Sequence, residues 1–264
     1  MYSLFFKISY MISLKNINVF YENAHILKNI TLDISKGEVT SIIGPSGSGK
    51  TTLLRILIGL SEPTSGEIWM QGKNLVKLSQ ADRQHIRRKM AIVFQQGALF
   101  DSLTVWENVA FPLYERTRMP LSELRREAEK LLEMVNLQEA ADLTIDRCSG
   151  GMQMRVAIAR AFACYPEIIL YDEPTSGLDP IARDLMCVLI QKLQFQQHVT
   201  SVLVTHQLST AFCTSNRFIV LNEGEVIFEG NADALMASKD PYIQRFIQPP
   251  SRVYREQGLI DWSN

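Results

Sequence analysis

The sequence VTSIIGPSGSGKTT runs from Val39 to Thr52 and places a short apolar strand directly before a glycine-rich loop. In the next segment, residues 53–60, apolar residues recur with helical spacing, so the loop joins a buried strand to a helix. Glycines let a backbone wrap closely around a polyphosphate with its N–H groups turned inward, and the helix N-terminus adds a favourable dipole. The stretch is therefore predicted to be a phosphate-binding P-loop rather than a glycine-rich turn that binds nothing.

ATP and Mg²⁺ are the cofactors that such a loop predicts. Lys50 is expected to place its charge at the β and γ phosphate oxygens, and the Thr51 hydroxyl is expected to ligate Mg²⁺. The residues predicted to contact the nucleotide are Gly44, Pro45, Ser46, Gly47, Ser48, Gly49, Lys50, Thr51 and Thr52.

Length and composition are those of an ordinary globular protein. The 264 residues, 46% hydrophobic and 21% charged, suit one large α/β domain or one domain with an inserted lobe. The formal net charge of −1 gives no basic excess that would favour nucleic acid as a partner. Cys148, Cys164, Cys187 and Cys213 lie far apart in the sequence, which indicates reduced thiols rather than a metal site.

The N-terminal residues 1–11 are apolar but too short to cross a bilayer, since a membrane helix needs roughly 20 residues. They also lack a signal-peptide cleavage pattern. One hypothesis is that these residues do not belong to the native start and that translation begins at Met11, because the first credible strand opens at Ile12. The intact mass of natively expressed protein would test it.

The rest of the chain divides by its periodicity. Alternation over residues 12–35 predicts antiparallel strands with one solvated side. Residues 97–165 carry helical periodicity and are interpreted as an inserted helical lobe. Strands and helices alternate again from Ile168, which predicts a parallel sheet with covering helices. The predicted domain spans 12–238, and residues 239–264 are interpreted as an extension rather than part of the core.

The strands expected in the second half are 168–171, 199–204 and 218–221, and the helices are 180–197 and 207–214. The first of these strands ends in two acids, Asp172 and Glu173. Carboxylates at the C-terminal end of a strand sit where ligands bind in open α/β sheets. We expect Asp172 to hold Mg²⁺ through water and Glu173 to orient or polarise an attacking water. A solvent-exposed acidic turn is the alternative when the motif stands alone.

Ser149, Gly150 and Gly151 precede a helical segment and form a second anion-binding device, with free N–H groups and a hydroxyl. Because one P-loop already holds the phosphates, this second turn is interpreted as serving a nucleotide bound by another copy of the chain. The alternative is an ordinary helix N-cap.

Three further residues are candidates for the same site. Gln95 follows a short buried strand and could reach Mg²⁺ or the attacking water with its amide. His206 ends another strand and could hydrogen-bond a γ-phosphate. Tyr21, after the first strand, could stack on adenine or could be a half-buried strand aromatic. Taken singly, residues such as Gln95 and His206 are more often satisfied polar residues than functional ones, and for Tyr21 both interpretations stay open.

Five motifs in order, GPSGSGKTT, Gln95, SGGM-x-x-R, LYDEPTSGLD at 170–179 and His206, resemble the ATPase subunits of ABC transporters. The resemblance covers about residues 12–235. It implies an α/β P-loop NTPase fold with a RecA-like core, an antiparallel β subdomain and an inserted helical subdomain. It also implies a Mg²⁺-dependent ATPase that is peripheral to the cytoplasmic side of the inner membrane and pairs head-to-tail with a second copy around two ATP molecules.

By this resemblance each motif takes a role. The assignments are Gly44 to Thr52 as Walker A, Gln95 as the Q-loop glutamine, Ser149 to Gly151 as the signature that closes on the neighbour's ATP, Asp172 and Glu173 as Walker B and the catalytic carboxylate, Asp179 as part of the D-loop, and His206 as the switch histidine. The family's usual LSGGQ signature is replaced by Cys148 to Met152, CSGGM. The hydroxyl and glycines remain, and Cys148 is interpreted as a small buried hydrophobe.

A narrower likeness lies in FQQGALFDSLTVWENVAFPL at 94–113, in Arg155 after SGGM, and in DPYIQRF at 240–246. These segments are similar to the ATPases of MCE-type lipid transporters, among them the Mla phospholipid system. The likeness implies a membrane permease, an MCE substrate-binding protein and often a STAS-domain regulator as partners. Leu99, Phe100 and Leu103 are expected to pack either on a permease helix or in the local core.

Other classes remain as alternatives. An ABC importer ATPase for amino acids or another small solute differs from the lipid reading only at 97–113 and in the tail. ABC ATPases that act on ribosomes or DNA usually carry two cassettes or long coiled coils, neither of which is present, and a cassette without catalysis conflicts with the Asp172–Glu173 pair.

Overall fold

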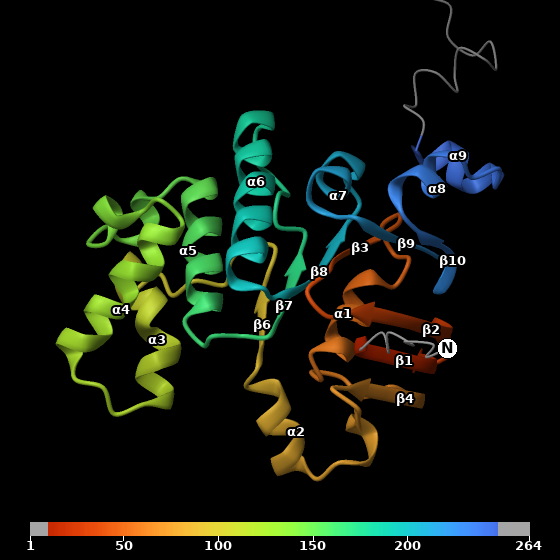
Figure 1. Ribbon diagram of the computed structural model, residues 1–264, viewed down its shortest axis with the longest axis horizontal. Coiled ribbons are helices and arrows are strands. Elements are labelled where there is room, and N and C mark those ends of the chain that lie inside the picture. The colour runs from red at the N-terminus through yellow and green to blue at the C-terminus, as the bar shows by residue number, and fades with distance from the viewer. Residues whose placement is uncertain (1–9, 248–264) are drawn as a thin grey trace, which may run out of the picture.

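The computed structural model describes residues 10–247. The hypotheses about residues 1–9 and about the tail beyond residue 247 lie outside these described residues. Two sheets and a group of helices make up the molecule (Figure 1). The order in the four-stranded sheet is β2-β1-β4-β5, with β1 Tyr10–Tyr21, β2 Ala24–Ser35, β4 Ser65–Met70 and β5 Lys73–Asn74. The order in the six-stranded sheet is β10-β9-β3-β8-β7-β6, with β3 Val39–Ile43, β6 Met90–Val93, β7 Ile168–Asp172, β8 Thr200–Thr205, β9 Arg217–Asn222 and β10 Glu225–Gly230.

The alternating pattern of residues 12–35 forms the antiparallel pair β1 and β2, as predicted. Its inward residues, such as Ile12, Leu14 and Ile17, have no exposed surface. They pack with Leu53 and Leu57 of helix α1 in one apolar cluster. This cluster therefore ties the antiparallel sheet to the helix that follows the P-loop.

The six-stranded sheet is parallel around its centre, where β3 lies between β8 and β9 and β7 lies between β6 and β8. Strands β3 and β8 are buried along their whole length, because helices or the second sheet cover both faces. Parallel strands end at one edge of a sheet, so the segments after β3, β6, β7 and β8 meet there.

The helices include two that match the predicted segments 180–197 and 207–214 closely. Their bounds are α1 Lys50–Leu57, α2 Gln80–Arg87, α3 Val105–Arg116, α4 Leu121–Met134, α5 Gly150–Phe162, α6 Pro180–Gln197, α7 Leu208–Thr214, α8 Ala232–Met236 and α9 Pro241–Ile247. Helices α3 and α4 stand apart from the sheets on one side of the molecule, and α5 lies between them and α6 (Figure 1). Within residues 10–247, no helix combines the length and apolarity that crossing a bilayer requires.

The lobe shares its core with the rest of the protein. One apolar cluster contains Val109 of α3, Leu132 of α4, Ile158 of α5 and Tyr171 of the central sheet. Helix α5 is thus packed on both sides, and a movement of the lobe must involve it.

The prediction that the segment after residue 238 stays outside the core is wrong for α9. Ile243 is buried in a cluster with Leu235 and Val220 of the sheet. The proline that suggested a break, Pro241, is the first residue of the helix, where a missing N–H costs nothing. The preceding Asp240 carboxylate accepts from two backbone N–H groups of the first turn, at 2.8 and 3.1 Å.

Candidate active site

The P-loop crosses from β3 to α1 and packs tightly against its neighbours. A Cβ added at Gly44 would lie 2.1 Å from the Leu221 carbonyl oxygen, and one at Gly49 would lie 2.7 Å from a Leu27 methyl carbon. Gly49 also has φ +102°, which side-chain-bearing residues rarely adopt. Glycine is therefore required at both positions, as expected for a loop whose backbone closes around a ligand.

Lys50 points back into this loop. Its Nζ donates to the carbonyl oxygens of Gly44 and Pro45, at 2.9 and 2.8 Å. Burial lowers the pKa of Lys50, and the charges of Glu173 and Asp172 oppose that change. The ammonium group thus lies among oxygen acceptors at the place where phosphate oxygens would compete for it.

The two acids follow β7 at the same edge of the sheet. Burial raises the pKa of Asp172, the Glu173 charge raises it further, and Arg55 and Lys50 act in the opposite direction. Glu173 is buried and has φ +50°, an uncommon backbone conformation for a residue other than glycine. Such strain is found at active sites when the surroundings hold it in place.

Three contacts hold the Glu173 carboxylate in place. The Thr205 hydroxyl donates to one carboxylate oxygen at 2.8 Å, and the His206 backbone N–H donates to the other at 2.9 Å. The His206 ring nitrogen Nδ1 lies 2.7 Å from that second oxygen. Sequence reasoning assigned Glu173 to the attacking water and His206 to a γ-phosphate, and it missed this direct pairing of the two side chains. It also missed Thr205, for which the only signal is its position next to His206.

Gln95 comes close to the same loop. Its side-chain Nε2 donates to the Ser176 hydroxyl at 3.0 Å, three residues after Glu173. Because β6 and β7 are parallel neighbours, with Val93 opposite Tyr171, the residues that follow them are side by side. The side chain is exposed and reaches the edge where the P-loop also ends.

Tyr21 lies at the end of β1 beside the P-loop. It lines a cleft of about 280 Å³ together with Gly47, Gly49, Lys50 and Thr51. Tyr21 is 46% exposed, which leaves its ring accessible for stacking. The structure thus brings the residue predicted to contact adenine to the loop predicted to contact phosphate.

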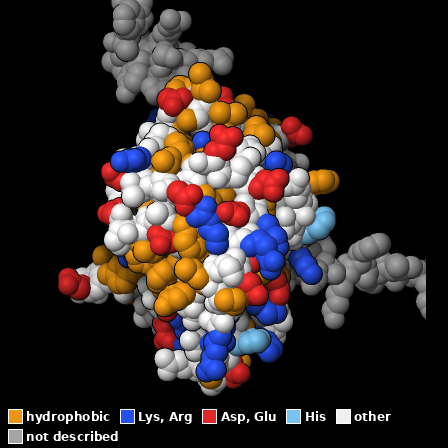
Figure 2. All heavy atoms as spheres, turned by 90° about the vertical axis from the view of Figure 1, so that its left-hand side faces the viewer, with side chains coloured by type: hydrophobic (Ala, Val, Ile, Leu, Met, Phe, Trp, Pro, Cys, Tyr) orange, Lys and Arg blue, Asp and Glu red, His pale blue; other side chains and the backbone are white. Residues whose placement is uncertain are grey.

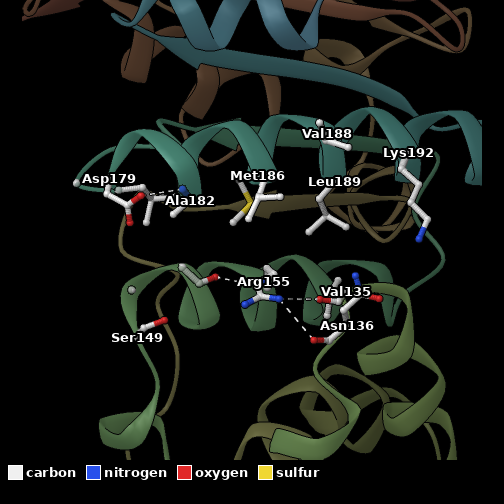
Figure 3. A pocket seen from close by; sticks show the side chains of 15 residues that line it. Val135, Asn136, Ser149, Arg155, Asp179, Ala182, Met186, Val188, Leu189 and Lys192 are labelled. Atoms are coloured by element: carbon white, nitrogen blue, oxygen red, sulfur yellow. Dashed lines mark hydrogen bonds between the residues drawn. The ribbon is translucent and has the colours of Figure 1, made fainter.

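Ser149 to Gly151 and Asp179 line a different cleft, of about 420 Å³, between α5 and α6. Figure 3 shows Asp179, Met186 and Leu189 on α6 facing Ser149 and Arg155 of the α5 segment. The Ser149 hydroxyl accepts from the Met152 N–H at 3.3 Å, so it also serves as the N-cap.

Asp179 caps α6 by accepting from the Ile181 and Ala182 N–H groups, both at 2.9 Å. The residues lining the α5–α6 cleft include none that line the P-loop cleft. Each chain therefore presents two separate clefts. Cys148, before the signature turn, is buried, as predicted.

Mg²⁺ fits the donors that lie at the P-loop edge. Among the described residues, no group of three or more His, Cys, Asp and Glu side chains could hold a metal by itself. Protein sites for Mg²⁺ commonly use one or two carboxylates together with substrate phosphates, and Asp172 and the Thr51 hydroxyl are donors of that kind. The raised pKa of Asp172, beside a second buried acid, is a cost that a bound cation would relieve.

Comparisons with known proteins point to one family. A family model described as "ABC transporter" matches residues 27–176. The chain is 37% identical over 237 residues to the intermembrane phospholipid transport system ATP-binding protein MlaF of Escherichia coli strain K12, covering 90% of this chain and 88% of that protein. It is 40% identical over 219 residues to the spermidine/putrescine import ATP-binding protein PotA of Thermotoga maritima, covering 83% of this chain but 58% of that protein.

A solved structure is similar as well. It is a dimeric ATP-binding cassette in a post-hydrolysis state bound to ADP and Pi, with 40% sequence identity and a TM-score of 0.76. The alignment covers 84% of this chain and 98% of that chain. The antiparallel sheet, parallel sheet and helical region described above are those of this cassette fold.

Proposed function

This chain belongs to the ABC transporter family as an ATP-hydrolysing subunit, and from that premise we propose that it powers phospholipid transport across the cell envelope. The observation that carries the proposal is the similarity to MlaF, which extends over nearly the full length of both proteins. The similarity to the polyamine importer ATPase covers only 58% of that protein. We propose a peripheral position on the cytoplasmic side of the inner membrane, with a permease and an MCE protein as partners and a STAS-domain regulator as a further one.

The proposed chemistry uses positioning and charge rather than a covalent intermediate. Lys50 would exchange its two carbonyl acceptors for phosphate oxygens. Glu173, oriented by Thr205 and His206, would orient the attacking water and receive its proton. Mg²⁺, held by Asp172 and Thr51 together with the nucleotide, would neutralise phosphate charge. In this proposal Gln95 contacts the metal or the water.

We also propose that the P-loop cleft of one copy closes against the Ser149 cleft of a second copy. The separation of the two clefts within one chain supports this arrangement, and the similar solved cassette is dimeric. Two-fold pairing then makes two equivalent sites, each holding one ATP between two chains.

The permease is proposed to dock on α3 and α4. Leu103, Trp106, Phe111, Tyr114 and Leu121 line an apolar groove of about 250 Å³ there. Figure 2, viewed from the side of these helices, shows hydrophobic side chains gathered on this face. A continuous exposed apolar patch of this kind marks an interaction site, and a short amphipathic helix of the permease would fit it.

The three residues predicted to meet the permease do not behave alike. Leu103 lines the groove, and Phe100 is 42% exposed and packs on Phe111 with ring centroids 4.5 Å apart. Leu99 is partly buried against the core of the lobe. The docking proposal therefore keeps Leu103 and Phe100 and assigns Leu99 to packing.

Import of a small solute is the second candidate function. It is supported by importer ATPases of similar identity, including the methionine import protein MetN of Carboxydothermus hydrogenoformans at 37%. The transported molecule does not touch an ATPase subunit of this kind, so the partners decide between the two candidates.

The test is affinity capture of the tagged full chain from detergent-solubilised native membranes, read by mass spectrometry. A permease recovered with an MCE protein supports phospholipid transport, and a permease recovered with a solute-binding protein supports the importer. Recovery of no membrane protein contradicts both. Tyr114→Asp should abolish capture of the permease, whereas Phe195→Asp, an exposed aromatic on α6, should not.

A further inference from the structure

Arg160, in the last turn of α5, joins this helix to the turn that carries Gln95. Its Nη1 donates to the Ala98 carbonyl at 2.8 Å, and its Nη2 donates to the Gly97 carbonyl at 2.6 Å. One guanidinium thus holds two consecutive carbonyls. A lysine ammonium lacks this planar fork and could not hold both in the same geometry.

Among the described residues, the guanidinium of Arg160 forms no salt bridge. Burial lowers its pKa, no carboxylate between residues 10 and 247 pairs with it, and its acceptors are the two carbonyls. A partly buried cation without a counter-charge is costly unless its hydrogen bonds compensate. The arrangement is therefore stable only while the turn stays against α5.

The Gln95 turn is also packed directly on the helix. The Gly97 N–H donates to the Phe94 carbonyl at 2.8 Å, which closes a four-residue turn with Gln95 as its second residue. A Cβ added at Gly97 would lie 3.3 Å from the Ala157 Cβ, and the residue has φ +70°. Gln95 therefore lies between a strand of the central sheet, β6, which precedes it, and the part of the turn that is hydrogen-bonded to α5, which follows it.

The opposite end of α5 is tied to the signature turn. The Gln153 Nε2 donates to the carbonyls of Ile145 and Cys148, both at 3.1 Å, and the Ser149 hydroxyl caps the first turn. Helix geometry places Ser149 and Arg160 about 16 Å apart along the axis. One rigid helix thus carries the Gln95 turn at its end and the Ser149 turn at its start.

We propose that Arg160 is a positioning residue that makes the Gln95 turn and the Ser149 turn of one chain move as one body. A shift of Gln95 toward the nucleotide on its own chain is passed through the Arg160 fork and α5 to Ser149, which faces the partner's nucleotide. The two ATP sites of a dimer are thereby coupled. The inference rests on the roles proposed above for Gln95 and Ser149.

The first experiment compares Arg160→Met with the wild-type full chain, using Mg²⁺-ATP hydrolysis and separate ATP binding measurements. We expect kcat to fall about tenfold, within the usual range of coupling between sites. The Kd for ATP should stay within about twofold, since coupling acts on a step after binding at the untouched Lys50 loop. Arg160→Lys should recover only part of the rate. Arg126→Met, which removes an exposed arginine of the same lobe, is the control and should match the wild type.

A double-mutant cycle separates positioning from general destabilisation. If Arg160 acts through Gln95, then Arg160→Met added to Gln95→Ala lowers kcat no further than Gln95→Ala alone. If the fold-loss of kcat in the double variant equals the product of the two single losses, the proposal is overturned. Equal hydrolysis by Arg160→Met and the wild type also overturns it.

Two further variants distinguish failure of the Arg160 proposal from failure of the role proposed for Gln95. Unchanged hydrolysis by Gln95→Ala alone would refute the role of Gln95 itself, which belongs to the proposed function. Gly97→Ala disturbs the same contact from the other side and substitutes for Arg160→Met if that variant does not fold. It should reproduce the loss of kcat with an unchanged Kd, and wild-type kcat would overturn the proposal.

Discussion

Glu173 is restrained by three contacts that come from two adjacent residues, Thr205 and His206. These residues are more than thirty positions away in the sequence and arrive through the pairing of β7 with β8. A carboxylate held in one orientation beside the P-loop is suited to position a water, because little rearrangement is then needed during the reaction.

Glu173→Gln should leave ATP binding intact and lower kcat by about 10³-fold, toward the upper end of what a general base contributes. The amide keeps the size of the side chain but cannot accept the proton. ATP titrations and steady-state hydrolysis measure the two effects. Hydrolysis at the wild-type rate would show that Glu173 is not the base.

Asp172→Asn should stabilise the nucleotide-free protein at neutral pH. The folded-state pKa of Asp172 is raised, chiefly by burial, so its stabilising effect is complete only below the ordinary Asp pKa and is lost as pH rises through the folded value. The neutral amide of Asn does not ionise, so the variant does not lose this stability as pH rises. Calorimetry should find a higher Tm for the variant at neutral pH, with a gain that shrinks as pH is lowered through the folded-state pKa toward the ordinary Asp pKa.

The same substitution should also weaken the stabilisation that Mg²⁺-ATP gives, since a carboxylate donor is lost. A gain in Tm that grows as pH falls would contradict the assigned direction of the pKa change.

At the scale of elements, the bounds of α6 and of the strands around the P-loop could be predicted from sequence because their signals are local. Asp179 caps α6 and Pro180 starts it, both within the helix's own first turn. The packing of α9 against the core could not be predicted from the sequence, because the burial of Ile243 depends on a surface formed by β9 and α8. Likewise, the residues of the site were found by motif, but the Glu173–Thr205 and Arg160–Gly97 hydrogen bonds depend on tertiary packing.

The junction of β3 and α1 offers a matched pair of glycine substitutions. Gly49→Ala should destabilise the fold by about 3 kcal/mol or more, since strain at positive φ adds to a close contact with Leu27. Gly37→Ala, at φ +73° with nothing within 4 Å, should cost only about 1–2 kcal/mol. Urea unfolding of both variants measures the difference. Equal losses would mean that the P-loop relaxes around a side chain.

At the scale of the whole molecule, the two clefts of one chain are separate, and the proposed dimer completes each site from two copies. Lys50→Ala disables the P-loop side, and Ser149→Ala disables the signature side. Each variant alone should be inactive, because every site in its dimer carries one defect.

An equal mixture of Lys50→Ala and Ser149→Ala chains should regain activity up to roughly a quarter of the wild-type rate, since half of randomly formed dimers contain one intact site out of two and coupling between the sites can only lower its rate. Hydrolysis is measured before and after mixing at constant total protein. A mixture no more active than its components would contradict shared sites. Combining both substitutions in one chain and mixing it with the Lys50→Ala variant is the control, because no intact site can form.

The separation of the two clefts also governs how the rate depends on protein concentration. A lone chain can bind ATP at its P-loop but lacks a facing signature turn, so it should hold the nucleotide without cleaving it. At low concentration the hydrolysis rate should then rise with the square of the protein concentration, and dilution should abolish specific activity. A permease that gathers two copies side by side would remove this dependence, so ATP consumption would be confined to assembled transporters.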